Sequence, residues 1–342
     1  MNMPLLDNKI VEHLKNLIKD VNQRIVILTH VNPDGDAIGS ALGLYGFLKL
    51  SGYNNISAIV PNNYASFLHW LPFNDEIIVA SDNIDKSNSL IADADLIFCL
   101  DFNDVSRVDN LSAALEKSKA AKILIDHHPN PDTDFFDLVI SDTSASSTAE
   151  LIFIAINSIN YNKFSLTKDI ATCLYTGIVT DTGSFSYASN NYQTYLIVAE
   201  LIFTGVNASQ VHNFIYDTYS EDRMRLLGYC LSEKLVVLPN KKVAYISLNK
   251  EELKRFNHRE GDTEGIVNYA LSIKGISLAA FFMEINGITK ISFRSKNSVD
   301  VNKIARMHFN GGGHMNASGG RMKSSLSEAV SLFEKLFSSE NL

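Results

Sequence analysis

The stretch RIVILTHVNPDGDAIGSALGLYGFLKL, residues 24–50, decides the fold class of this chain. Its first six residues form a short β-branched apolar run, and apolar residues recur at helical spacing from Ala37 to Leu50. Between them lies the turn sequence NPDG, residues 32–35, in which proline fixes its own φ and glycine permits a positive φ. The stretch therefore predicts a buried strand, a tight loop and a helix.

Further short apolar runs follow at residues 57–60, 96–100 and 122–125, with helical patterns between them. Such an alternation indicates a mainly parallel sheet covered by helices on both faces. Helices are also expected over residues 149–158 and 170–179, the first capped by the Ser/Thr cluster at residues 144–148. Since ligands bind beyond the carboxyl ends of parallel strands, polar residues that follow these runs are the first candidates for a site.

A further helix is predicted at residues 192–203, followed by a long helical connection at 209–235. Beyond it the sequence pattern changes, with predicted strands at 242–248, 276–285 and 288–294 and a closing helix at 327–337. Asn286-Gly287 between the last two strands is a strong hairpin signal. We therefore predict a first domain over residues 1–210, a helical linker over 211–235 and a smaller α/β domain over 236–342.

Bulk properties limit the classes of protein to consider. The chain has 342 residues, enough for two domains, and no apolar run approaches the roughly 20 residues that cross a bilayer. Residues 1–20 lack the apolar stretch of a signal peptide, and Cys99, Cys173 and Cys230 are too far apart for a disulfide framework. The net charge of −8 disfavours long duplex nucleic acid as a partner. We expect a cytoplasmic protein with buried thiols and no membrane partner, and a small anionic substrate stays compatible.

Carboxylate and imidazole side chains follow the ends of the buried runs. In chain order they are His30, Asp34, Asp36, Asp101, Asp126, His127, His128 and Asp181. Taken singly, Asp36 could cap the helix behind it, and Asp101 and Asp181 could be ordinary loop residues. Two adjacent imidazoles at a strand end, however, have no packing rationale. A pair of divalent metal ions explains why these groups would converge at one sheet edge.

The ligand chemistry narrows the choice of metal. An oxygen-rich set with one imidazole per ion suits Mn²⁺, suits Mg²⁺ less well, and matches structural Zn²⁺ poorly. Two such ions can generate a nucleophile and stabilise the leaving oxygen of a phosphoryl displacement. Gly39 and Ser40 would keep the first helical turn small enough for a ligand to approach. Without metal, the close carboxylates would repel one another.

A second cluster lies near the C-terminus. Arg294 ends a predicted strand, and Gly311-Gly312-Gly313-His314 follows. A glycine run lets the backbone approach a phosphate or a base edge, and an arginine can hold a phosphate through two hydrogen bonds. A glycine-rich loop alone is more often simply flexible. Beside Arg294 and His314, it favours recognition of a nucleotide or a phosphate.

Together these motifs resemble the DHH/DHHA1 phosphoesterases, in particular the small bacterial oligoribonuclease/pAp-phosphatase type. The matching segments are residues 30–40, 101–103 (DFN), 126–129 (DHHP), 180–183 (TDTG), 293–295 (FRS) and 311–319 (GGGHMNASG). Ser318 stands where the family often has alanine, which keeps the residue small. The resemblance implies an N-terminal DHH domain, a smaller C-terminal DHHA1 domain, and an active site in the cleft between them.

The resemblance also implies two Mn²⁺ ions, for which Mg²⁺ or Co²⁺ could substitute. Both ions would share Asp101 and Asp181. The remaining ligands, listed by ion, would be His30 and Asp34 for one, and Asp36 and His127 for the other. By the same resemblance, His128 and Asp126 would act at the phosphate, His128 next to it and Asp126 by orienting a histidine. Arg294, Gly311, Gly312, Gly313 and His314 would hold the far end of the substrate.

The implied activity is hydrolysis of very short oligoribonucleotides to mononucleotides, and of pAp to AMP, by a homodimer. Relatives that act on pyrophosphate or polyphosphate carry a different C-terminal domain, so the Gly311–His314 signature argues against those substrates. Two alternatives stay open. One is a phosphodiesterase for linear or cyclic dinucleotides, and the other is a nucleotide- or RNA-binding module without catalysis.

Overall fold

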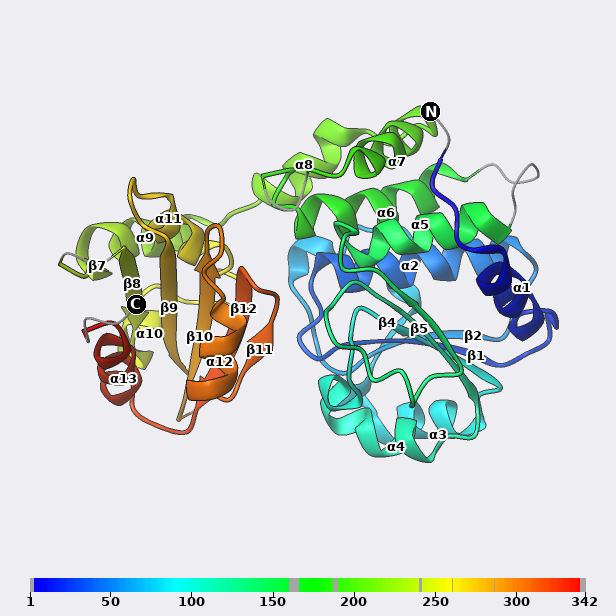
Figure 1. Ribbon diagram of the computed structural model, residues 1–342, viewed down its shortest axis with the longest axis horizontal. Coiled ribbons are helices and arrows are strands. Elements are labelled where there is room, and N and C mark those ends of the chain that lie inside the picture. The colour runs from blue at the N-terminus through cyan, green and yellow to red at the C-terminus, as the bar shows by residue number, and fades with distance from the viewer. Residues whose placement is uncertain are drawn as a thin grey trace. The chain divides into compact units, whose positions relative to one another are not determined.

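The computed structural model describes residues 3–159, 166–186, 190–239, 242–259, 261–285 and 287–338. The chain divides into two compact units, Met1–Thr218 and Tyr219–Leu342, and each contains a six-stranded sheet with helices (Figure 1). This confirms the predicted α/β class. Among the described helices, none combines the length and the apolar character needed to cross a membrane.

The sheet of the first unit is parallel throughout, with the strand order β3-β2-β1-β4-β5-β6. Its strands are β1 (Ile25–Thr29), β2 (Ile56–Val60), β3 (Ile77–Val79), β4 (Leu96–Leu100), β5 (Ala121–Asp126) and β6 (Leu138–Ser141). The chain order reverses between β1 and β4. In doubly wound sheets the crevice beyond the carboxyl ends of such a strand pair binds ligands. His30 and Asp101 directly follow these two strands.

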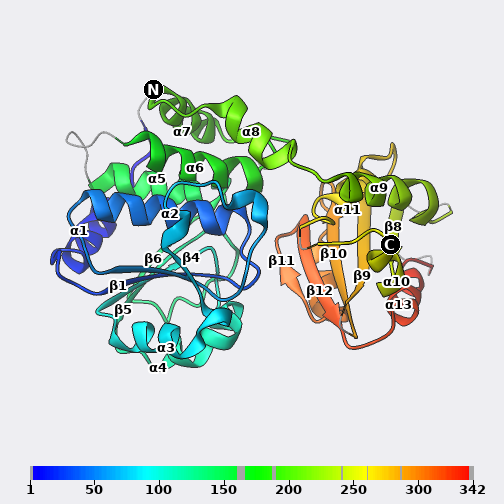
Figure 2. The ribbon, with the colours of Figure 1, turned by 180° about the vertical axis from the view of Figure 1, so that it is seen from behind.

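Helices cover both faces of this sheet (Figures 1 and 2). One face is covered by α2 (Gly35–Leu50), α5 (Thr148–Ile159) and α6 (Lys168–Asp181), with α1 (Asn8–Leu17), α7 (Tyr192–Phe203) and α8 (Ala208–Tyr216) added to the same core. The other face is covered by α3 (Ile84–Asp93) and α4 (Ser112–Lys117). Along β1, Ile25 and Ile27 enter the first core and Val26 and Leu28 the second. A strand buried on both faces must be apolar throughout, which explains the continuous run.

Glycines allow α2 and α6 to approach closely. A Cβ atom at Gly39 would lie 2.5 Å from the carbonyl oxygen of Cys173, and one at Gly35 would lie 2.4 Å from Oγ1 of Thr180. Gly39 therefore serves helix packing, and the prediction that its small size leaves room for a ligand is wrong. This close packing brings Asp36 on α2 next to the end of α6, where Asp181 lies.

The second unit has the strand order β11-β12-β10-β9-β8-β7, with β8 and β9 parallel and the other pairs antiparallel. The strands are β7 (Leu235–Val237), β8 (Val243–Leu248), β9 (Leu278–Ile285), β10 (Ile288–Ser295), β11 (Gly312–Gly313) and β12 (Ala317–Met322). One core contains residues of α9 (Glu221–Tyr229), α10 (Lys250–Arg255) and α11 (Ile266–Ser272). The core on the opposite face contains α12 (Val301–His308) and α13 (Leu326–Ser338).

Several local predictions are settled by these elements. The β9–β10 hairpin is confirmed, with Ile285 paired to Ile288, although Asn286 lies outside the described residues. The glycine run is not a flexible loop, because Gly312–Gly313 form β11.

The long helical connection is broken into α8, α9 and a π-helical turn, Cys230–Lys234, before β7. The three cysteines are buried free thiols, as expected. The predicted linker at residues 211–235 stays a prediction.

Candidate metal centre

His30 directly follows β1, and its ring lies next to two carboxylates. Its Nε2 atom is 3.3 Å from Oδ2 of Asp101 and 4.0 Å from Oδ1 of Asp34. Its Nδ1 atom lies 2.9 Å from the carbonyl oxygen of Val31. Because a carbonyl only accepts hydrogen bonds, Nδ1 carries a proton, and loss of any proton on Nε2 would free that lone pair for a ligand. His30, Asp34 and Asp101 can therefore hold one metal ion.

Asp34, rather than Asp36, caps α2. Oδ1 of Asp34 accepts hydrogen bonds from the N–H groups of Asp36 and Ala37, at 3.0 and 3.1 Å. The reading of Asp36 as the cap is thus wrong, since Asp36 lies inside the first turn with its side chain buried. Its Oδ2 atom is 3.9 Å from Nε2 of His127. One loop therefore supplies carboxylates to two different histidines.

Asp101 belongs to both groups of potential ligands. It has a left-handed φ of 63°, a conformation that costs a non-glycine residue energy and that recurs at functional sites. While Oδ2 of Asp101 faces His30, its Oδ1 atom is 3.6 Å from Nε2 of His127. Asp36, Asp101 and His127 form the second group that can hold a metal ion. The shared carboxylate makes the two groups a single cluster.

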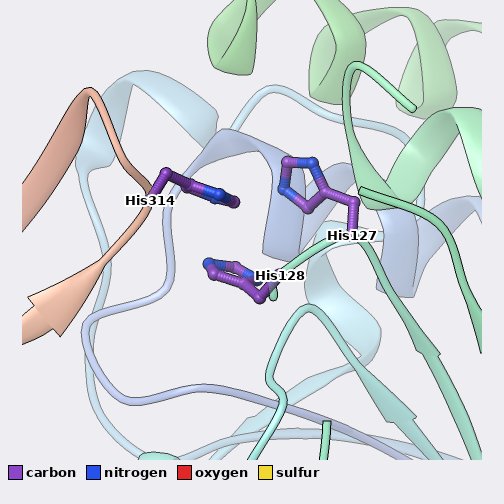
Figure 3. Close-up of side chains that lie close together, drawn as sticks. All are labelled: His127, His128 and His314. Atoms are coloured by element: carbon purple, nitrogen blue, oxygen red, sulfur yellow. The ribbon is translucent and has the colours of Figure 1, made fainter. Parts of the chain in front are cut away.

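His127 and His128 follow β5, and their rings point in different directions (Figure 3). The ring centroids are 5.0 Å apart and the ring planes are 74° apart. Nε2 of His127 lies 3.5 Å from Oδ2 of Asp181 at the end of α6. Nδ1 of His128 is instead 2.7 Å from Oδ1 of the fully buried Asp126. Asp126 thereby fixes the orientation of the His128 ring, as a carboxylate behind a functional histidine does.

The buried charges shift one another's pKa values. Burial raises the pKa of Asp36, and the negative charges of Asp101 and Asp181 raise it further. Burial also opposes ionisation of Asp101, but its hydrogen bond to His30 and the neighbouring histidines lower its pKa overall. Burial would lower the pKa values of His30 and His127, yet the carboxylates around them raise both. A divalent cation would replace these protons and neutralise the carboxylates.

The N-terminus of α5 supports two of the carboxylates. The N–H groups of Thr148 and Ala149 donate to Asp36 at 2.6 and 2.9 Å. Oγ1 of Thr148 donates to Oδ1 of Asp101 at 2.9 Å. The positive end of the helix dipole also favours carboxylates here. The sequence showed only a capping cluster, because nothing local reveals that this helix end points at Asp36.

The side chain of Glu150 accepts hydrogen bonds from Ser146, in the segment before α5, and from α7. Its buried Oε2 atom accepts hydrogen bonds from the N–H and Oγ of Ser146, at 3.1 and 2.6 Å. The same atom accepts from Oγ1 of Thr194 on α7 at 2.8 Å. Glu150 therefore joins α7 to the segment that presents Thr148. Sequence reasoning missed this role, and the only available signal was a glutamate in an otherwise apolar helix.

The predicted substrate-binding residues lie on neighbouring strands and turns of the second unit. Arg294 on β10 is opposite Ala317 on β12. His314 lies in the turn between β11 and β12 (Figure 3), where its N–H donates to the Ala317 carbonyl at 2.8 Å. A Cβ atom at Gly311 would lie 1.9 Å from the Gly319 carbonyl oxygen, so glycine is required there. The roles of these residues toward a substrate stay predictions.

A doubly wound sheet with carboxylates and histidines at its switch point is typical of a metal-dependent hydrolase. Similarity to known protein families identifies which one. Residues 24–178 match the DHH family, N-terminal domain, and residues 240–339 match the DHHA1 domain. The chain belongs to the DHH/DHHA1 phosphoesterases and is a hydrolytic enzyme.

Individual relatives cover nearly the whole chain. A Bacillus subtilis protein named bifunctional oligoribonuclease and PAP phosphatase NrnA is 32% identical, over 86% of this chain and 88% of its own. A Thermus thermophilus protein of the same name is also 32% identical, over 90% and 86%. The crystal structure of an exopolyphosphatase-related protein from Bacteroides fragilis has a TM-score of 0.91 at 42% identity, covering 97% and 96% of the two chains.

A more distant structure, RecJ from Thermus thermophilus in complex with Mn²⁺, has a TM-score of 0.58 at 12% identity. The aligned region covers 98% of this chain and 56% of RecJ, and at this identity the match shows a similar fold alone.

Proposed function

We propose that this enzyme is a Mn²⁺-dependent phosphoesterase that hydrolyses very short oligoribonucleotides to mononucleotides and pAp to AMP. The observation that carries the proposal is the cluster, buried except for Asp34, in which Asp101 joins the His30–Asp34 pair to the Asp36–His127 pair. The names of the two 32% identical relatives supply the substrate class.

The donor set fits two divalent cations. Carboxylate oxygens and imidazole nitrogens suit Mn²⁺, with Mg²⁺ or Co²⁺ as substitutes. The proposed ligands are His30, Asp34, Asp36, Asp101, His127 and Asp181, with Asp101 and Asp181 shared. When bound, the ions would supply an activated water nucleophile and neutralise the charge that develops on the leaving oxygen. The raised pKa of Asp36 supports this assignment, since a carboxylate crowded by like charges gains most from a cation.

The remaining site residues act on the substrate itself. Asp126 accepts a hydrogen bond from Nδ1 of His128, which leaves Nε2 to contact an oxygen of the scissile phosphate. Arg294 is proposed to hold a second phosphate through two parallel hydrogen bonds. Residues 311–313 and His314 would contact the same end of the substrate through backbone N–H groups and the imidazole.

One substrate panel tests the proposal. The purified protein with Mn²⁺ is offered pAp, pApA, pGpG, a cyclic dinucleotide, a pentaribonucleotide, pyrophosphate and polyphosphate. We expect AMP from pAp and mononucleotides from the short RNAs. Turnover restricted to polyphosphate or pyrophosphate would contradict the proposal, and polyphosphate belongs in the panel because the 42% identical structure is described as exopolyphosphatase-related. Exclusive turnover of dinucleotides would favour the phosphodiesterase alternative, and tight binding of every substrate without product would contradict the proposal.

His127→Ala tests the metal assignment directly. This variant should lose hydrolysis of every substrate while its circular dichroism spectrum stays unchanged. His13→Ala, the same substitution at an exposed position of α1, is the matched control and should keep full activity. Near-normal activity of His127→Ala would exclude His127 as a ligand. The proposed homodimer is tested separately by sedimentation equilibrium.

A further inference from the structure

Positive charge is concentrated in the second unit. Residues 219–342 contain 18 Lys and Arg against 13 Asp and Glu, whereas residues 1–218 contain 12 against 25. The formal charges are therefore +5 and −13, and the total of −8 conceals a basic unit. Within residues 287–324 there are seven basic residues and one acidic residue. This part of the molecule is suited to a larger anion than a single phosphate.

The pairing of β10 with β12 gathers basic side chains on one face of the sheet. Side chains alternate along a strand, so Lys290, Ser292 and Arg294 point to the same face. Arg321 on β12 is directly opposite Lys290 and shares that face. Lys290 and Arg321 are exposed, whereas Ile291, the next residue along β10, is buried in the core of the other face.

Lys290 and Arg321 form an arrangement that costs stability. Side chains directly opposite each other in an antiparallel pair have Cβ atoms about 4.5–5.5 Å apart, and like charges there repel. On the described parts of β9, β10 and β12, no acidic side chain shares this face. Met283 is opposite Lys290 on β9, and Glu284 points to the other face. Thr263, which lies between Asp262 and Glu264, contacts Met283 on this face, but no carboxylate of the described residues lies within ion-pair distance of Lys290 or Arg321. A bound anion would therefore neutralise the pair.

A low, polar surface connects this pair to Arg294. Ser292 is opposite Gly319, where a Cβ atom would meet only the Ile291 carbonyl oxygen, at 3.7 Å. Arg294 lies four positions after Lys290 on β10, which is about 14 Å at the rise of an antiparallel strand. A single phosphate cannot contact both ends of such a surface. A chain of phosphates can follow it, with little side-chain bulk in the way.

We propose that Lys290 and Arg321 form a second anion subsite that binds the phosphodiester backbone of substrates longer than a dinucleotide. The inference rests on the proposed function and deepens it, because it assigns a length preference to the same substrate class. Basic side chains that contact phosphates carry no base specificity, so the subsite is independent of sequence. A mononucleotide such as pAp ends before reaching it. The subsite therefore lowers KM for longer RNA and leaves pAp unaffected.

The Lys290→Ala/Arg321→Ala variant tests the subsite. We expect KM for a pentaribonucleotide to rise roughly tenfold with kcat unchanged, since phosphate contacts contribute to binding. The KM for pAp should not change. Each phosphate contact of a single strand contributes about 0.7 to the slope of log affinity against log salt, so the pentamer slope should fall by about 1.4. The matched control, Lys274→Ala/Lys303→Ala, removes the same charge from a turn and from α12 on the other face.

The outcomes separate this inference from the proposed function. If the wild type hydrolyses both substrates and the variant keeps the same ratio of KM values, the subsite is wrong. If the wild type hydrolyses neither, the proposed function is wrong, and anisotropy of a labelled pentaribonucleotide in metal-free buffer still measures the subsite. The melting temperature of the double variant reports on its folding. It should equal or exceed that of the wild type, because the substitutions remove the repulsion between Lys290 and Arg321. Should the double variant unfold, Lys290→Gln replaces it, with a smaller expected rise in KM.

Discussion

At the scale of single residues, Asp36 is the proposed ligand for which metal binding and stability oppose each other most. Its buried carboxylate lies near Asp101 and Asp181, and its pKa is raised well above the ordinary value. Asp36→Asn removes the charge but keeps an oxygen for only one of the two N–H groups of α5, since Thr148 donates to Oδ2 and Ala149 to Oδ1. The relief of like-charge repulsion and the loss of one hydrogen bond oppose each other, so we expect the metal-free variant to melt close to the wild-type temperature. At about 100 times the dissociation constant of Mn²⁺, the wild type should gain about 2.7 kcal/mol and the variant much less. A differential scanning calorimeter measures both, and an undiminished gain would exclude Asp36 as a ligand.

The same residues predict how stability depends on pH. Burial would lower the pKa values of His30 and His127, but the carboxylates around them raise both, so the folded protein binds more protons than the unfolded chain. The free energy of unfolding of the metal-free protein should therefore fall as pH rises above the ordinary histidine pKa of about 6.5. The pKa of Asp101 is lowered in the folded protein, so its ionised carboxylate stabilises the fold at neutral pH. This contribution to the free energy of unfolding is lost as pH falls into the acidic range.

Binding of Mn²⁺ would displace the protons on the two histidines and on Asp36. Its stabilising effect should therefore grow over the pH range in which the metal-free protein loses stability. Urea unfolding at a series of pH values, with EDTA or with Mn²⁺, gives both curves. Metal-free stability that rises with pH above 6.5 would show that the two histidines are not charged in the folded protein.

At the scale of elements, the N-terminus of α5 donates hydrogen bonds to two carboxylates of the proposed metal site. Thr148→Val removes the hydrogen bond to Asp101 while the backbone N–H group still donates to Asp36. Partners behind metal ligands typically change affinity by about 10–100-fold, so we expect a loss of about tenfold in Mn²⁺ affinity by titration calorimetry. Thr172→Val is the control, because the Thr172 hydroxyl donates to the Lys168 carbonyl within its own helix and not to a carboxylate of the site. Equal affinities in both variants would leave Thr148 with a capping role alone.

The α2–α6 contact makes a separate prediction about packing. Gly39→Ala places a methyl group against backbone of α6 and must push the helices apart, at a cost of about 1–3 kcal/mol. The shift also moves Asp181 relative to Asp36, so Mn²⁺ affinity should fall together with stability. Gly228→Ala on α9 is the matched control, since no neighbour lies within 4 Å, and the better helix propensity should raise stability by up to about 1 kcal/mol. Unfolding in urea compares the two variants, and a neutral Gly39→Ala would contradict the packing role.

At the scale of the whole molecule, the sequence predicted what depends on local pattern. Strands β1 and β4 are buried on both faces, so they were recognisable as continuous apolar runs. Short edge strands such as β3 and β7 are only partly buried and gave no such pattern. The glycines of β11 have no side chains to show a period at all.

The same limit applies to the site. His30, Asp101 and the His127–His128 pair were found because they directly follow buried strands, whereas Asp181 ends an apolar helix. Contacts such as Asp36 with Thr148 join residues on separate elements, and only the assembled sheet and helices bring them together. The contacts that the sequence could not predict are mostly contacts between residues on separate elements, because no local pattern encodes how the elements pack.

The division into two units predicts two responses to metal. Each unit has its own hydrophobic cores, and all six proposed metal ligands lie in the first. Calorimetry should therefore resolve two unfolding transitions, and Mn²⁺ should raise the temperature of only one. Asp36→Asn identifies that transition, because it should abolish the shift without moving the other. An equal shift of both transitions by Mn²⁺ would mean that the second unit supplies a ligand or that the two unfold as one.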